Sequence, residues 1–181
     1  MVIVYCIAVY FITNSNPLVF LKKISPAQLL AFSTSSSAAT LPLTMDRVEN
    51  HIGVDREVSS FVLPVGATIN MDGTSLYQAV AAVFIAQALE FDLTLADQLT
   101  IVLTALLASI GSAAVPGAGM VMLVIVLESI GFPSDKLVIG LALIFAVDRP
   151  LDMCRTVVNV TGDAAVSMIV GRSVGKFKGI K

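Results

Sequence analysis

A set of charged and amide side chains near the C-terminus has the residue types and the spacing to hold a small polar ligand. Five such residues follow one another at intervals of 4, 3, 4 and 4 positions: Asp148, Asp152, Arg155, Asn159 and Asp163. This spacing places all five on one face of a helix, which we call the polar stripe. An arginine can hold a carboxylate through two parallel hydrogen bonds, and an aspartate one turn away can hold an ammonium group. The stripe therefore indicates a ligand that carries both an amine and a carboxylate.

The polar stripe belongs to an unusually apolar chain. Of its 181 residues, 56% are hydrophobic and only 13% are charged, whereas a soluble domain has about 25% charged residues. On an insertion scale, each charge at the centre of a membrane helix costs about 2.5 to 3.5 kcal/mol, so the stripe is expected to face protein, water or ligand. Two other interpretations remain open. Arg155 could form a purely structural ion pair with Asp148 or Asp152, or the stripe could cover the surface of a soluble helical protein, which the low charge content disfavours.

The apolar runs that must position the stripe are interrupted by small and polar residues. The breaks lie at 33–37, 70–74 and 111–119. Irregular backbone is tolerated at membrane depth only where protein or a water-filled cavity surrounds it. Short, interrupted apolar segments in corresponding positions point to the binding site of a transporter. We therefore expect an all-α membrane protein, in which two re-entrant helical hairpins and broken transmembrane helices form an inverted-repeat transport domain.

These breaks also set the expected boundaries of the segments. The first apolar run is shorter than the roughly 20 residues that span a bilayer, so we expect a C-terminal fragment of a longer transporter. In chain order we expect the end of a preceding transmembrane helix over 1–16 and a substrate-binding core over 17–181, with hairpin 1 over about 24–47, an unwound helix over about 57–90, hairpin 2 over about 94–131 and a last helix over about 134–171.

Oxygen-bearing side chains provide candidate ligands for a cation. Asn70, Asp72 and Asp163 offer hard oxygen atoms, which suit Na⁺, whereas the chain has no array of thiolates or imidazoles for a transition metal. Gly73, next to Asp72, is expected to let the helix unwind and expose backbone carbonyls. The net charge of −2 gives no basic surface for nucleic acid.

An enzyme is not expected. Ser36, Ser37 and Ser112 could be considered as nucleophiles. However, the chain has no G-x-S-x-G motif, and its single histidine, His51, lies in a polar segment away from these serines.

Four motifs, in this order, resemble the glutamate transporter family, the dicarboxylate/amino acid:cation symporters. The motifs are Ser35-Ser36-Ser37, Asn70 to Thr74, Val115 to Gly119, and Asp152 to Thr156 followed by Asn159 to Asp163. The resemblance covers the chain from about Pro17 to Lys176. It implies the moving domain of an elevator-type secondary transporter, which spans the plasma or inner membrane several times and forms a homotrimer when full length.

The resemblance also implies roles for individual residues. The implied substrate-binding residues are Ser36, Ser37, Thr74, Val115, Gly119, Asp152, Arg155, Thr156 and Asn159. The implied sodium ligands are Gly66, Thr68, Asn70, Met71, Asp72, Ser109, Ile110, Ser112, Asn159 and Asp163. A third sodium site would also need residues from an earlier helix that this chain lacks.

The chain departs from the family pattern at three places. Relatives carry an arginine either at the first hairpin tip, where this chain has Ser35, or in the last helix, where it has Met153. Arg149 stands one turn before that position and is a candidate replacement. Ala114 occupies a position at the second tip that is usually glycine.

The function implied is sodium-coupled symport of acidic amino acids such as glutamate and aspartate, with Na⁺, the substrate and the lipid bilayer as partners. A sodium-coupled symporter of dicarboxylates or of neutral amino acids is an alternative. Asp152 argues against a substrate without an amine, and Arg155 argues against a neutral one. A truncated remnant that does not transport is a further alternative.

Overall fold

The computed structural model describes residues 1–180, and the regular structure of these residues is helical. Outside the helices, the described chain has a single isolated bridge between Val54 and Phe177. The expectation of an all-α chain is therefore confirmed. Lys181, the last residue of the expected core, lies outside the described residues. The elements are α1 (Val2–Thr13), α2 (Pro17–Thr34), α3 (Ser37–Asp46), the π-helix η1 (Arg47–Ile52), α4 (Arg56–Ile69), α5 (Asp72–Ala88), α6 (Leu95–Ile110), α7 (Ala118–Ser129) and α8 (Ser134–Ser173).

Local sequence signals explain where several helices begin. The Asn16 side chain accepts a hydrogen bond from the Leu18 N–H at 2.9 Å, and Pro17 occupies the first helical position of α2. Asp55 caps α4 in the same way through the Glu57 N–H. Thr94 and Asp97 form a reciprocal capping box at the start of α6.

Two helix pairs enclose the tips that the sequence singled out. The tip between α2 and α3 contains Ser35, which adopts a left-handed conformation with φ of 51°, and Ser36, whose hydroxyl caps α3 at the Ala39 N–H. The tip between α6 and α7 ends at Gly117, whose φ of 78° favours glycine. The expected hairpins covered about 24–47 and about 94–131. That these pairs are the re-entrant hairpins of a transport core stays a prediction.

The break between α4 and α5 lies at Asn70 and Met71, whose backbone angles are not helical. The role expected for Gly73 was wrong, because this residue is in the first turn of α5. A Cβ atom at position 73 would lie 2.6 Å from the Arg155 carbonyl oxygen and 2.9 Å from Asn159 Oδ1. Gly73 therefore allows α5 to approach α8 closely, and the unwinding happens before it.

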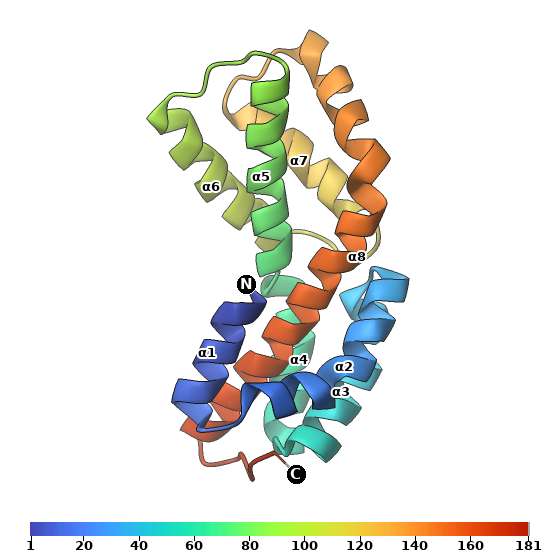
Figure 1. Cartoon of the computed structure of the whole chain (residues 1–181), viewed down its shortest axis with the longest axis vertical. Coiled ribbons are helices and arrows are strands. Elements are labelled where there is room, and N and C mark those ends of the chain that lie inside the picture. Colours follow the sequence, from blue (N-terminus) through green and yellow to red (C-terminus); the bar gives the residue numbers. More distant parts are fainter. Residues whose placement is uncertain (181) are drawn as a thin grey trace.

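The long helix α8 joins two groups of helices (Figure 1). α1 to α4 pack around its C-terminal half, in the lower part of the view, and α5 and α7 pack against its N-terminal half, with α6 on the outer side of α5 and α7. Each group has its own core of buried apolar side chains: Phe20, Ile24 and Leu63 belong to the first, and Ile85, Leu123 and Leu127 to the second. The polar stripe lies on α8 where the two groups meet. In the described part of the chain, no individual helix is both long enough and apolar enough to cross a membrane.

The segment that follows α8 turns back along the loop before α4. Lys178 donates its backbone N–H to the Gly53 carbonyl and the Asp55 N–H bonds the Lys176 carbonyl, both at 2.9 Å. The Lys176 ammonium also pairs with the Glu57 carboxylate. These contacts fix the C-terminal end of α8 against the first group of helices.

Candidate solute and cation site

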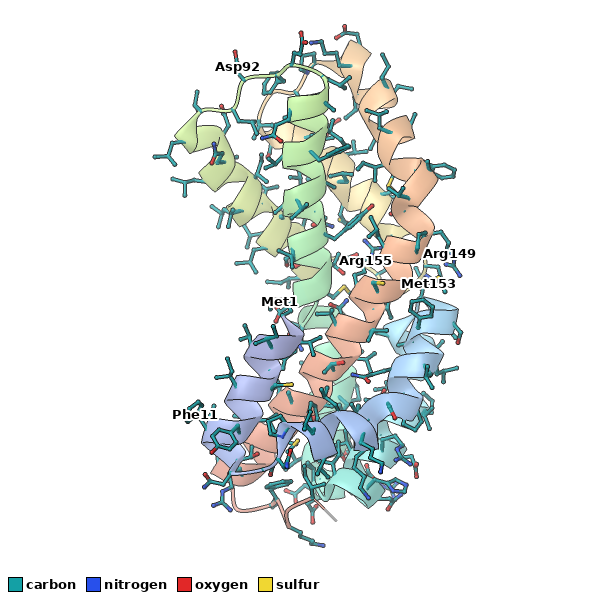
Figure 2. All side chains as sticks on the ribbon, in the orientation of Figure 1. Met1, Phe11, Asp92, Arg149, Met153 and Arg155 are labelled. Atoms are coloured by element: carbon teal, nitrogen blue, oxygen red, sulfur yellow. The ribbon has the colours of Figure 1, made fainter. Side chains whose placement is uncertain are left out.

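The five members of the polar stripe are all buried, as the spacing predicted. Their exposed fractions are 8% for Asp148, 2% for Asp152, 6% for Arg155, 4% for Asn159 and 3% for Asp163. Figure 2 shows Arg155 in the middle of the molecule, where the two groups of helices meet. The stripe therefore faces protein along its whole length.

Arg155 and Asp152 are paired with each other. Arg155 Nε and Nη2 lie 2.8 and 2.7 Å from the same atom, Asp152 Oδ1. Asp152 Oδ2 accepts a hydrogen bond from the Gly117 N–H at 3.0 Å, which links the second hairpin tip to α8. Arg155 Nη1 is buried and has no hydrogen-bond partner among the described residues. An unpaired buried donor is costly, about 1 to 3 kcal/mol, so this atom is suited to receive an acceptor from a ligand.

Tyr77 on α5 holds Arg155 from another side. The guanidinium carbon lies 5.0 Å from the centre of the Tyr77 ring, which is within the range of a cation–π interaction. The Tyr77 hydroxyl donates a hydrogen bond of 2.6 Å to Asp148 Oδ1. Sequence reasoning missed Tyr77, because nothing in the spacing of α5 indicates that an aromatic ring lies beneath an arginine on a distant helix.

Gly119, in the first turn of α7, lies directly against Arg155. A Cβ atom at position 119 would clash with Nη1 of the guanidinium and would lie 2.6 Å from Nη2. The backbone of the second hairpin therefore approaches Arg155 as closely as the absence of a side chain permits.

A small cavity lies between the two hairpin tips, α5 and α8. Its volume is about 20 Å³, which is roughly the space of one water molecule. Seven of the nine expected substrate residues line it: Ser37, Thr74, Val115, Asp152, Arg155, Thr156 and Asn159. The other two lie beside it, since Gly119 contacts Arg155 and the Ser36 hydroxyl donates a 2.7 Å hydrogen bond to the Ala114 carbonyl. The two hairpin tips thus touch each other beside the cavity.

The expected sodium ligands gather in part below this cavity. Asp163 Oδ1 accepts a hydrogen bond of 2.9 Å from the Asn70 side chain, and a Cβ atom on Gly66 would lie 2.6 Å from the same oxygen. The Asn159 side chain lines the cavity and is bonded to the start of α5. Its Oδ1 accepts from the Gly73 N–H at 2.8 Å, and its Nδ2 donates to the Thr74 hydroxyl at 3.2 Å.

The carboxylate of Asp72 has a partner that the sequence did not indicate. The hydroxyl of Tyr5, on α1, donates to Asp72 Oδ2 at 2.6 Å. The Tyr5 oxygen also occupies the space beside Gly162, where a Cβ atom would lie 2.5 Å from it. The first helix of the chain therefore reaches the group around Asn70, Asp72 and Asp163.

The remaining expected ligands are more scattered. Met71 and Ser112 line the cavity, and the Ser109 and Ser75 hydroxyls lie 2.6 Å apart. Thr68 is exposed and its hydroxyl bonds the Val65 carbonyl of its own helix. Ile110 is also exposed.

The positions that depart from the family pattern lie in different surroundings. The Ser35 side chain is buried and its hydroxyl lacks a hydrogen-bond partner among the described residues. Arg149 is 57% exposed, and its Nη1 lies 4.0 Å from Asp152 Oδ2. Figure 2 labels Arg149 and Met153 beside each other on α8. Arg149 is therefore close enough to Asp152 to add positive charge near the cavity.

Comparison with known proteins identifies the family. Residues 1–173 match the model of the sodium:dicarboxylate symporter family. The chain belongs to this family. The symporter family and the relatives described next are transporters, which agrees with the expectation that the chain is not an enzyme.

Relatives within the symporter family are identical to this chain at about half of the aligned positions. Excitatory amino acid transporter 5 of Homo sapiens is 52% identical over 161 residues, which are 89% of this chain and 28% of that protein. Excitatory amino acid transporter 1 of Rattus norvegicus is 50% identical over 169 residues, 93% of this chain and 30% of the relative. An excitatory amino acid transporter of Caenorhabditis elegans is 51% identical over 163 residues, 90% of this chain and 32% of the relative. The chain thus spans less than a third of the length of these relatives.

Proposed function

We propose that this chain forms the solute- and cation-binding part of a sodium-coupled symporter of acidic amino acids. The observation that carries the proposal is the pair formed by Asp152 and Arg155, buried next to a small cavity between two hairpin tips. The names of the relatives, excitatory amino acid transporters, support the same substrate class.

The geometry supports a ligand with three charged groups. Asp152 is oriented to hold an ammonium group. The free Nη1 of Arg155 is oriented to hold a carboxylate, with Nη2 as a second donor once its bond to Asp152 is exchanged. A second carboxylate would meet the first tip and Asn159. The ligand replaces the partner of each buried charge, so neither Asp152 nor Arg155 is left uncompensated.

Binding requires the hairpin tips to separate, because the cavity of about 20 Å³ is far smaller than an amino acid. Two hydrogen bonds of the second tip would have to break, that of the Ala114 carbonyl with the Ser36 hydroxyl and that of the Gly117 N–H with Asp152. The second tip, which takes part in both hydrogen bonds, is the proposed gate. Opening it frees Asp152 for the ammonium group.

Sodium is the proposed coupling ion. The buried Asp163 and the partly buried Asn70 and Asp72 provide hard oxygen atoms, and such atoms suit a small hard cation. Asn159 lines the cavity and lies one helical turn before Asp163 on α8, so a cation at Asp163 and a solute in the cavity would order neighbouring turns of the same helix. Each would then raise the affinity for the other.

The membrane arrangement is part of the same proposal. The two helix pairs α2–α3 and α6–α7 would be re-entrant hairpins in an inverted repeat, and α8 would be surrounded by protein within the bilayer. Exposed apolar side chains along α5, such as Leu76, Val80 and Phe84, would then contact lipid or further helices of a trimeric, multi-pass transporter.

The test is sodium-dependent binding of labelled aspartate to the purified chain in lipid nanodiscs. We expect Arg155→Cys to abolish aspartate binding while binding of serine, a small neutral amino acid, is retained. Arg172→Cys, a change at an exposed arginine in the last turn of α8, is the matched control. Retention of aspartate binding by Arg155→Cys would contradict the assignment of Arg155.

The same assay separates the alternatives. Displacement of labelled aspartate by succinate as effective as by glutamate would favour a dicarboxylate symporter, and displacement by serine at equal concentration would favour a neutral amino acid symporter. A folded chain that binds none of them would favour the remnant.

A further inference from the structure

A second pocket lies at the end of the molecule where α8 ends. Its volume is about 370 Å³, and it is lined by the turn between α1 and α2 on one side and by the end of α8 and the segment after it on the other. The C-terminus lies at the same end, in the lower part of Figure 1. Arg172 of this pocket follows Arg155 by 17 positions, which corresponds to about 25 Å of helix. The pocket is therefore separate from the candidate solute site.

Two cations line this pocket without an acidic partner. Arg172 belongs to the last turn of α8 and Lys178 to the segment after it; both are exposed, and neither forms an ion pair with another described residue. Lys176, by contrast, pairs with Glu57. None of the described residues that line the pocket is acidic. Positive charge is thus concentrated here in a chain whose net charge is −2, which favours an anionic ligand.

Exposed apolar side chains flank the pocket along the two helices that meet at its turn. Phe11 and Ile12 are near the end of α1, and Leu18 and Val19 are at the start of α2; all four are exposed, and Val19 lines the pocket. Figure 2 shows Phe11 on the outer side of α1. A ligand that uses all of these side chains has an anionic group next to an apolar part. A phospholipid with a negative headgroup has both, whereas a free phosphate ion has only the first.

We propose that this pocket binds the phosphate of an anionic phospholipid, with Arg172 and Lys178 as cationic partners and with the acyl chains along Phe11, Ile12 and Leu18. The inference rests on the membrane arrangement in the proposed function, because the pocket must lie at a bilayer surface. A guanidinium can hold two phosphate oxygens at once, and the ammonium group of a lysine adds a point charge beside them. A lipid bound in this way joins the C-terminal segment to the turn between α1 and α2.

Native mass spectrometry of the purified chain in detergent tests the charge preference. Phosphatidylglycerol should bind more than about tenfold more tightly than zwitterionic phosphatidylcholine with the same acyl chains. Lys178→Gln should raise the Kd for phosphatidylglycerol about fivefold, the share of one basic residue near an anionic surface. Lys22→Gln, the same change at an exposed lysine of α2 outside the pocket, is the matched control. Equal Kd values for the two lipids, or for the two variants, would overturn the proposal.

A second variant places a negative charge in the pocket without removing a cation. Ser15 lines the pocket and directly precedes Asn16, the cap of α2. A carboxylate next to a helix N-terminus is favourable, so Ser15→Glu should unfold at no lower temperature than the wild type. Its side chain would compete with the phosphate for Arg172 and Lys178, and the Kd for phosphatidylglycerol should rise at least as much as in Lys178→Gln. Ser15→Gln is the uncharged control. A folded Ser15→Glu chain that binds this lipid like the wild type would exclude the pocket as its site.

Competition by glycerol phosphate, which has the phosphate but no acyl chains, separates a lipid from a free phosphate group. It should displace phosphatidylglycerol only at a concentration far above that of the lipid, and displacement at equal concentration would overturn the assignment to a lipid. None of these measurements needs an amino acid or sodium. If the chain binds no aspartate but shows the expected lipid preference, the lipid site stands and the proposed function fails. If it binds aspartate with sodium but does not distinguish the two lipids, the proposed function stands and the lipid site fails.

Discussion

Gly119 and Arg155 share one small space, since any side chain at position 119 would overlap the guanidinium. The relationship ties the first turn of α7 to the middle of α8. It also means that the second hairpin can move away from the charged centre of the site but cannot move closer to it.

Gly119→Ala is therefore expected to weaken binding of acidic amino acids. The added methyl group displaces Nη1, and overpacking of this kind costs about 1 to 3 kcal/mol, which corresponds to a rise in the Kd for aspartate of about 5-fold to 150-fold. Gly111→Ala in the same hairpin is the matched control, because its nearest neighbouring atom would lie 3.9 Å away. Equal Kd values for the two variants would contradict the steric explanation.

Gly66→Ala should lower the affinity of the chain for sodium and leave its affinity for the amino acid little changed. A methyl group there would press on Asp163 Oδ1, which would be 2.6 Å away. We expect the sodium concentration needed for half-maximal aspartate binding to rise at least severalfold, while the maximal amount bound at saturating sodium is little changed. Titration of binding with sodium chloride at constant ionic strength measures this. A fall in maximal binding without a shift in the sodium midpoint would count against a cation site at Asp163.

Ser36→Ala should loosen the contact between the hairpin tips. The change removes the hydrogen bond to the Ala114 carbonyl and the cap at the Ala39 N–H, and loss of a helix cap alone costs about 1 kcal/mol. Hydrogen exchange of the backbone amides at 112–118 should become faster. Ser33→Ala is the control, since that hydroxyl bonds only the Leu30 carbonyl of its own helix. Unchanged exchange in Ser36→Ala would mean that the bond to Ala114 does not hold the tips together.

The start of α6 is expected to be sensitive to acid. The Thr94 hydroxyl and then the Thr94 backbone N–H donate to Asp97, and they hold the pKa of this exposed carboxyl below its ordinary value, about 3.9 for aspartate. Because the folded pKa is the lower one, the contribution to helix stability is complete above the unfolded pKa and is lost as the pH falls through the folded pKa.

Hydrogen exchange of the first turn of α6 should accordingly accelerate below about pH 4, after correction for the intrinsic pH dependence of exchange. Thr94→Ala should remove most of this pH dependence. If the wild type and Thr94→Ala show the same corrected profile, the capping box does not control the end of the helix.

The sequence predicted the parts of this structure that depend on local spacing. The intervals between Asp148 and Asp163 were enough to place five residues on one buried face, because helix geometry fixes which side chains share a side. The cost of exposing those charges to lipid then required that the face be covered. Clusters of serine and glycine likewise indicated where the chain turns.

Contacts between distant segments could not be predicted in the same way. Tyr77 and Tyr5 reach Asp148 and Asp72 across 71 and 67 positions of the chain, and no local pattern distinguishes them from the tyrosine at position 10. The role of Gly73 also depends on a distant segment and was therefore predicted wrongly. Next to a helix break it suggested unwinding, whereas its actual role depends on how near α8 lies.

The 40 residues of α8 form a single helix, Pro150 included, and this continuity has a consequence for engineering. Arg155 and Asp163 are held in phase only by the number of residues between them. One alanine inserted after Val157 would turn Asp163 by about 100° relative to Arg155, away from Asn70. Substitutions can therefore tune either ligand separately, but the length of this interval must remain as it is.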